Sequence, residues 1–121
     1  MKRIAFAPEH TDLASRQLAA ELRLGVAAAL DDGHPVSIDL RNVASISESY
    51  ADELFGVLAM GLGLEEFVAK VAILHAGPYV LRVIAHALKD RLEERDSLVA
   101  HSQVRALVAA KHARQSKAHY C

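Results

Sequence analysis

The apolar positions of this chain fall into short runs that alternate with longer stretches of helical spacing. Three runs predict strands, near residues 2–7, 36–41 and 71–75. The run at 36–40 alternates apolar and polar residues, which is typical of a strand with one buried face. The run at Val71–Leu74 is apolar throughout, and it predicts a central strand covered on both faces.

The stretches between these strands have the spacing of amphipathic helices. Thr11 or Asp12 is expected to cap the first helix, and Gly33 is expected to end it in a left-handed conformation. The buried stripe of this helix is expected to contain Ala14, Leu18, Leu22, Val26 and either Ala29 or Leu30. Further helices are expected at about 50–62, from Pro78 onward, and around 103–114.

Strands that alternate with helices indicate an α/β fold, with a mainly parallel or mixed sheet covered by three to four helices. We expect a single domain over residues 1–96 and a basic C-terminal helix or tail over 97–121. The apolar face of each element supplies the predicted core, which contains Ile38, Leu40, Leu54, Leu58, Ile73 and Ile84.

Composition fits this picture and narrows the class of protein. The chain has 121 residues, of which 52% are hydrophobic, enough for one domain with a buried core. No apolar run is long enough for a signal peptide or a membrane span, and the single cysteine, Cys121, can form no internal disulfide. We therefore expect a cytoplasmic protein that does not associate with membranes.

Charge is distributed unevenly along the chain. Residues 1–96 hold 10 Lys and Arg against 15 Asp and Glu, whereas residues 97–121 hold four basic residues and no acid. A basic segment can bind nucleic acid, but this one has no interleaved aromatic residues. A solvated helix end, either free or docked on the acidic body, is the favoured interpretation.

The candidate functional residues lie in three loops that follow the strands, at the edge where parallel sheets bind their ligands. These are residues 9–11, 44–50 and 75–78. The second loop and the helix start after it are crowded with hydroxyls and carboxylates: Ser45, Ser47, Glu48, Ser49, Asp52 and Glu53. Ser49 and Asp52 fit a loose capping box, so helix capping alone explains part of this cluster.

An enzymatic alternative uses the same edge of the sheet. A small α/β hydrolase would take Ser47 or Ser49 as nucleophile, His75 or His10 as base, and Glu9 or Asp52 to orient the base. No Gly-x-Ser-x-Gly elbow surrounds either serine, so we do not favour an enzyme. The seven histidines lack metal-binding spacing and the glycines form no phosphate loop, so we expect neither a metal nor a cofactor.

The segment 36–58 resembles the core of the bacterial STAS-like domains of unknown function. The sequence Ser-Tyr-Ala-Asp-Glu-Leu-Phe-Gly at residues 49–56 carries the resemblance, with Tyr50 where Phe is more usual. The flanking layout extends the resemblance to about residues 4–95. The family is similar to the anti-sigma-factor antagonists, small α/β domains that bind a serine kinase resembling histidine-kinase ATPases and are switched by serine phosphorylation.

The resemblance implies a non-enzymatic regulatory module whose partner is a protein, with a histidine-kinase-like ATPase or kinase as the candidate. Alignment with the antagonist motif puts Ser47 at its Asp, Glu48 at the phosphorylated Ser, Ser49 at the next Ser/Thr and Tyr50 at its Gly. Ser49 or Ser47 would have to receive any phosphate, and the surrounding acids predict that phosphorylation is absent or inefficient. The implied partner surface comprises Ser47, Glu48, Ser49, Tyr50, Asp52 and Glu53. The sequence does not predict an oligomeric state.

Overall fold

Strand β3 (Val36–Asp39) lies at the centre of a three-stranded parallel sheet, between β1 (Ile4–Phe6) and β5 (Val71–Leu74). This computed structural model describes the backbone of residues 2–120 and the side chains of residues 2–100. In register, Phe6 lies beside Ile38, and Ile38 beside Ile73. Strand β5 is thus an edge strand, and the prediction that it would be central is wrong; Leu74 at its end is 38% exposed.

A second parallel pair, β2 (Asp12–Leu13) with β4 (Ser45–Ile46), was not predicted. It explains why neither Thr11 nor Asp12 caps the first helix. Asp12 belongs to β2, and the helix α1 (Arg16–Asp31) begins later, with Ser15 as its N-cap. The Ser15 hydroxyl accepts a hydrogen bond from the Leu18 backbone N–H at 3.2 Å.

The later start of α1 also changes its buried stripe. Ala19, Val26 and Ala29 are buried, whereas Ala14 and Leu18 are exposed, Leu18 by 42%. The predicted stripe is therefore correct only in the second half of the helix. The predicted helix end is confirmed, because Gly33 follows α1 with a φ of 86°.

The predicted helix at 50–62 is present as one continuous run with three parts. It comprises α2 (Glu48–Ala51), the π-helical segment η1 (Asp52–Gly56) and α3 (Val57–Leu62). Gly63, with a φ of 83°, ends the run, and the unpredicted helix α4 (Leu64–Lys70) follows it. Glu65 and Glu66 lie in the first turn of α4, where negative charge favours a helix start.

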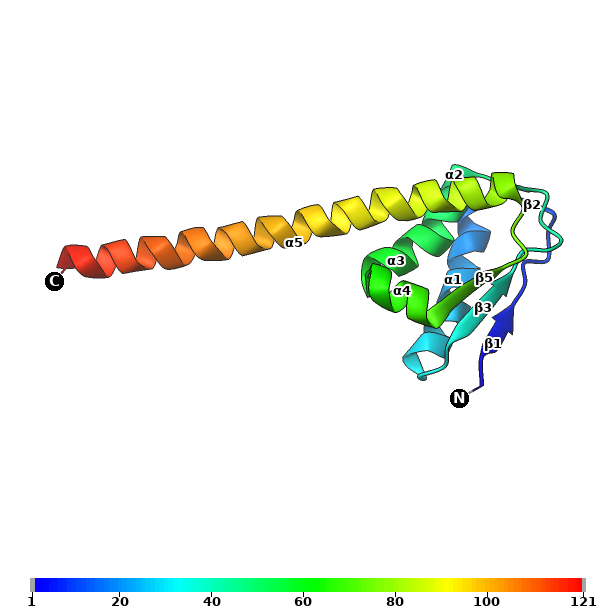
Figure 1. Cartoon of the computed structure of the whole chain (residues 1–121), viewed down its shortest axis with the longest axis horizontal. Helices are drawn as coiled ribbons and strands as arrows, with labels where there is room; N and C mark the ends of the chain where they lie inside the picture. Colours follow the sequence, from blue (N-terminus) through cyan, green and yellow to red (C-terminus); the bar gives the residue numbers. More distant parts are fainter. Residues whose placement is uncertain (1, 121) are drawn as a thin grey trace.

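The last helix, α5 (Pro78–Tyr120), starts at Pro78 as predicted but is one unbroken helix of 43 residues. The separate helix expected around 103–114 is part of it, and the expected boundary at residue 96 lies within it. Figure 1 shows α5 crossing the body and carrying the C-terminal residues away from it. The predicted basic tail lies mostly outside the residues whose side chains the structure describes.

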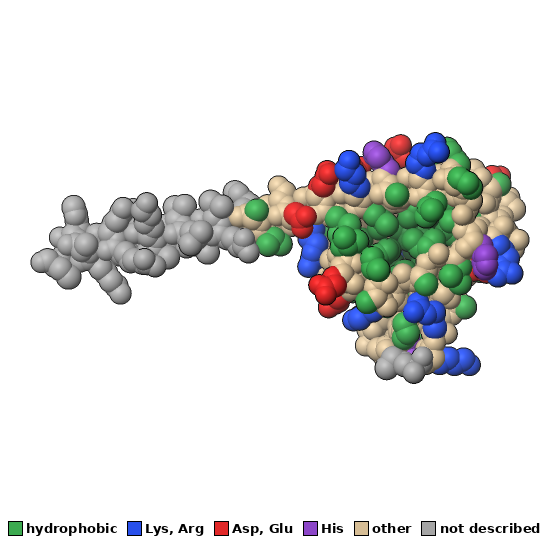
Figure 2. All heavy atoms as spheres, viewed as in Figure 1, with side chains coloured by type: hydrophobic (Ala, Val, Ile, Leu, Met, Phe, Trp, Pro, Cys, Tyr) green, Lys and Arg blue, Asp and Glu red, His purple; other side chains and the backbone are tan. Residues whose placement is uncertain are grey.

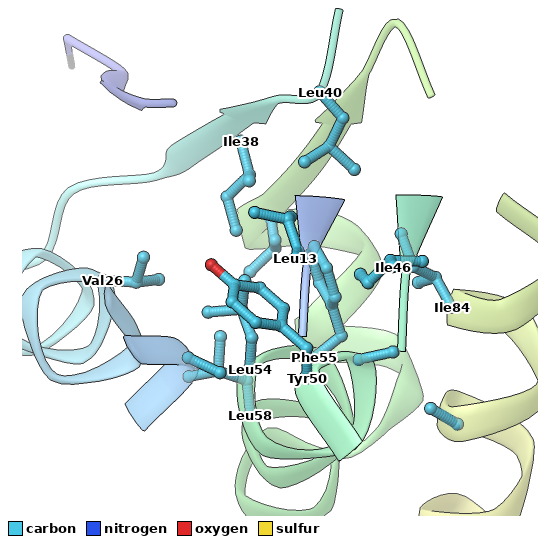
Figure 3. Packing of buried hydrophobic residues seen from close by; sticks show 14 of the residues in the cluster. Leu13, Val26, Ile38, Leu40, Ile46, Tyr50, Leu54, Phe55, Leu58 and Ile84 are labelled. Atoms are coloured by element: carbon cyan, nitrogen blue, oxygen red, sulfur yellow. The ribbon is translucent and has the colours of Figure 1, made fainter. Parts of the chain in front are cut away.

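The core lies between the sheet and the helices. Figure 3 shows Tyr50, Leu54 and Phe55 from the helix run meeting Ile38 and Leu40 from the sheet side. Of the six predicted core residues, five are buried, and Ile73 on the edge strand is half-buried. The α/β fold, with a parallel sheet and four helices in the described part of the chain, confirms the predicted class.

Candidate functional site

The candidate site begins where β4 meets α2, at Ser47. Its hydroxyl accepts from the Tyr50 backbone N–H at 3.0 Å and donates to the Ala14 carbonyl at 3.2 Å. Its backbone N–H donates to the Leu13 carbonyl at 2.7 Å. Ser47 is therefore the N-cap of α2, and the capping box expected between Ser49 and Asp52 is wrong.

Glu48 and Ser49 occupy the first turn of α2 and are both exposed. They border a cleft of about 240 Å³ between this turn, α1 and α5. The other residues lining the cleft are Arg16, Asp52, Val83, His86, Ala87 and Asp90. These two exposed residues are the predicted site residues that a partner can reach most directly.

Tyr50 was predicted to contact a partner, but only 3% of its surface is exposed. Burial raises the pKa of its phenol above the ordinary value. It contributes to the walls of two grooves beside α1, of about 360 and 230 Å³, together with His10 and Leu18. Tyr50 is principally a core residue that also lines these grooves.

Asp52 is held by two arginines from different helices. Arg91 of α5 donates through Nε and Nη2 to Oδ1 and Oδ2 of Asp52, at 2.7 and 2.9 Å. Arg16 of α1 lies 3.3 Å from Oδ2. The hydrogen bonds from Arg91 hold the pKa of Asp52 below its ordinary value, and the pKa of Arg91 is raised in return.

Glu53 makes the corresponding link to α1. Its Oε1 lies 3.3 Å from Nη1 of Arg16, and its Oε2 lies 3.3 Å from Nη2 of Arg23. Asp52 and Glu53 thus fasten α5 and α1 to the same helix run. The arginine partners of these two carboxylates lie 30 or more positions away in the sequence. The sequence signal for them is the seven-residue spacing of Arg16 and Arg23, which places both arginines on one side of α1, two turns apart.

Gly56 allows the close approach of α5. A Cβ at this position would lie 2.8 Å from Oδ1 of Asp52 and 2.9 Å from Cγ of Arg91. Gly56 is also the last residue of the π-helical segment that begins at Asp52. Four motif residues, Asp52, Glu53, Gly56 and Tyr50, are thus explained by how the domain is assembled.

Arg95 provides the last side-chain hydrogen bonds between the body and the part of α5 whose side chains are described. Its Nη1 donates to the Met60 carbonyl and, at 3.4 Å, to the Gly61 carbonyl. These carbonyls lie in the final turn of α3, where cationic side chains are favourable.

The third candidate loop forms a separate polar cluster. His75 has a φ of 57°, and its Nδ1 lies 3.1 Å from Oδ1 of Asp39. Arg41 donates to Asp39 from its backbone N–H at 3.0 Å and from Nε at 2.8 Å. Burial acts to raise the pKa of Asp39, but the hydrogen bonds from Arg41 and His75 outweigh it and leave the pKa lowered.

The members of the hydrolase alternative are not brought together. Ser47 bonds to backbone groups, His75 to Asp39, and Asp52 to arginines. Among residues 2–100, no hydrogen bond joins Ser47 or Ser49 to a histidine. Across the same residues, no three His, Cys, Asp or Glu side chains gather into a metal-binding group. None of the helices in the described region has the length and apolar character that crossing a bilayer requires.

Comparison with known protein families agrees with the fold. A model described as a STAS-like domain of unknown function (DUF4325) matches residues 19–81, from α1 to the first turn of α5. This match covers just over half of the chain, and the chain belongs to this family. The resemblance carried by residues 36–58 is thereby confirmed. Comparison with curated proteins and with solved structures gives no match.

Proposed function

We propose that this domain is a non-enzymatic regulatory module that binds a protein partner through Glu48, Ser49 and the cleft beside them. The observation that carries the proposal is the exposure of these two residues at a helix start, while Asp52 and Glu53 are bound by arginines of the domain itself. The site lies at the carboxyl side of the sheet, where open α/β folds bind their ligands. Membership of the STAS-like family supports a regulatory role.

The charge of the cleft indicates the chemistry of the partner. Arg91 and Arg16 neutralise Asp52, which leaves Glu48 as the acid of this helix run that is available on the rim. A partner surface with Lys or Arg side chains complements this acid. The likeness to anti-sigma-factor antagonists makes an ATPase resembling histidine kinases our candidate partner.

Glu48 keeps this surface negatively charged in all states, so binding does not depend on phosphorylation. The Ser47 hydroxyl already makes two hydrogen bonds, and a phosphate on Ser49 would lie beside Glu48 and near Asp52. Partner concentration or the nucleotide state of the partner then controls the complex. Phosphopeptide mapping of protein from native cells should find no substantial phosphate on Ser47 or Ser49; abundant phosphate on either would contradict constitutive binding.

A charge reversal with a matched control tests the site. Glu48→Lys places a cation in the first turn of α2, and Glu65→Lys does the same in the first turn of α4, away from the cleft. Both variants lose the same favourable helix-dipole interaction, so each should change the free energy of unfolding by no more than about 1 kcal/mol.

The tagged wild type and both variants are used as baits in native cells, and bound proteins are quantified by mass spectrometry. The partner recovered with wild type should be recovered equally with Glu65→Lys and reduced about tenfold with Glu48→Lys. Titration calorimetry with the purified partner then gives the affinities. Equal affinity of wild type and Glu48→Lys would remove this site as the interface.

A further inference from the structure

The C-terminal part of α5 extends beyond the body of the domain. Arg95 makes the last hydrogen bonds to α3, and the side chains of residues 96–100 are all exposed. We call residues 96–120 the arm; at 1.5 Å per residue it is about 37 Å long. Isolated helices are marginal in water and gain most of their stability from packing, so a surface that covers the arm would stabilise it.

The surface of α5 where the arm begins is acidic. Asp90, Glu93, Glu94 and Asp96 are exposed there. The arginines of this stretch turn toward the body instead: Arg91 binds Asp52 and Arg95 binds the end of α3. Figure 2 shows the charged side chains along the solvent side of α5. The helix surface left for a partner therefore carries net negative charge.

The rest of the arm is basic. Its sequence contains Arg105, Lys111, Arg114 and Lys117 and no acid. One helix thus carries an acidic segment followed by a basic one. Two such helices side by side in parallel would place like charges together, whereas antiparallel helices would place opposite charges together.

We propose that a second copy of this chain covers the arm, in an antiparallel pair of α5 helices related by two-fold symmetry. A register centred between Gln103 and Val104 sets Asp96 opposite position 111 and Glu93 opposite position 114. The same register sets Asp90 opposite position 117. Lys or Arg occupies all three facing positions, and the symmetry repeats each pairing.

The apolar positions fit the same register. Leu98 and Val99 are 54% and 47% exposed at the beginning of the arm. In the second copy, position 109 at the level of Leu98 is alanine, and position 108 at the level of Val99 is valine. Apolar residues therefore meet at this level, and the second helix would cover part of the exposed apolar surface.

Sedimentation equilibrium of the full chain tests the pairing. Wild type should dimerise, with a dissociation constant that rises with salt concentration. Glu93→Lys with Asp96→Lys makes one variant, and Lys111→Glu with Arg114→Glu makes the other. Each variant alone should dimerise about tenfold more weakly, and an equimolar mixture of the two should form a heterodimer of restored affinity. The rescue in the mixture shows that both variants are folded.

Disulfide cross-linking tests the register. In a Cys121→Ser background, Val104→Cys lies next to the two-fold axis and should form linked dimers on oxidation. Ser97→Cys should not, because the two copies of position 97 would lie about 20 Å apart along the helix axis. A monomeric wild type, a dimer that neither charge reversal weakens, or linked dimers from Ser97→Cys would each overturn the proposal.

Discussion

Gly56→Ala tests the docking of α5 because helix propensity and packing predict opposite signs. In a free helix, alanine is more favourable than glycine by about 1 kcal/mol. In this domain the added Cβ would lie 2.8 Å from Oδ1 of Asp52 and 2.9 Å from Cγ of Arg91, both well inside normal contact. Relieving these contacts requires the ion pair to shift or α5 to move away. Overpacking of this kind costs about 1–3 kcal/mol, and weakening of the charged hydrogen bonds adds to it.

We therefore expect Gly56→Ala to lower the free energy of unfolding by about 1–3 kcal/mol, measured by urea denaturation followed by circular dichroism. Gly61→Ala is the matched control, because Gly61 lies in the same helix run and nothing lies within 4 Å of its added Cβ. This control should be neutral or more stable by up to about 1 kcal/mol.

A double-mutant cycle locates the cause. Arg91→Ala removes the atom nearest to the new methyl group in α5, so Gly56→Ala should cost less in that background than in wild type. A Gly56→Ala variant as stable as Gly61→Ala would refute the argument that this glycine is needed for α5 to approach. An unchanged cost in the Arg91→Ala background would show that the strain lies elsewhere.

Three further predictions concern stability. Ser47→Ala should cost about 1 kcal/mol in urea denaturation and Ser49→Ala much less, because only Ser47 caps α2; equal costs would contradict the assignment. Asp52→Asn should cost about 1–3 kcal/mol at neutral pH. Since the pKa of Asp52 is lowered by folding, its stabilisation is complete above the ordinary 3.8 and is lost as pH falls through the lower folded value, so wild type and variant should converge in acid. Leu54→Ala, at a fully buried position, should cost about 2–5 kcal/mol, and an unchanged melting temperature would contradict the assigned core.

The periodicity of the sequence predicted those features that depend on one element at a time. Ile38 and Leu54 lie on clear apolar faces, and both are buried. The pairing of strands that lie far apart in the sequence does not follow from the periodicity of a single segment. The β2–β4 pair joins residues more than 30 positions apart, and it displaced the expected helix cap from Asp12 to Ser15. The order of the strands likewise could not be derived from the apolar run of β5.

For the candidate site, too, the sequence predicted local features but not the contacts between distant segments. The local crowding of acids and hydroxyls correctly marked a helix start at the carboxyl side of the sheet. It did not separate Glu48, which is exposed, from Asp52 and Glu53, which are bound by arginines of α1 and α5. Carboxylates next to each other in sequence point toward different helices, and their partners follow only from the three-dimensional packing.

The unbroken course of α5 gives the domain a rigid lever. From residue 79 to 120 the helix contains neither proline nor glycine, the residues at which helices most often kink. Its fulcrum is the hydrogen-bonded contact between Arg91 and Asp52, which lies directly against Gly56. Asp52 also lines the cleft at Glu48 and Ser49. About 44 Å separate Arg91 from residue 120 along the helix, so a tilt of about 10° at this fulcrum would displace the far end by about 8 Å. A small rearrangement at the cleft would thus be amplified into a movement several times larger at the tip.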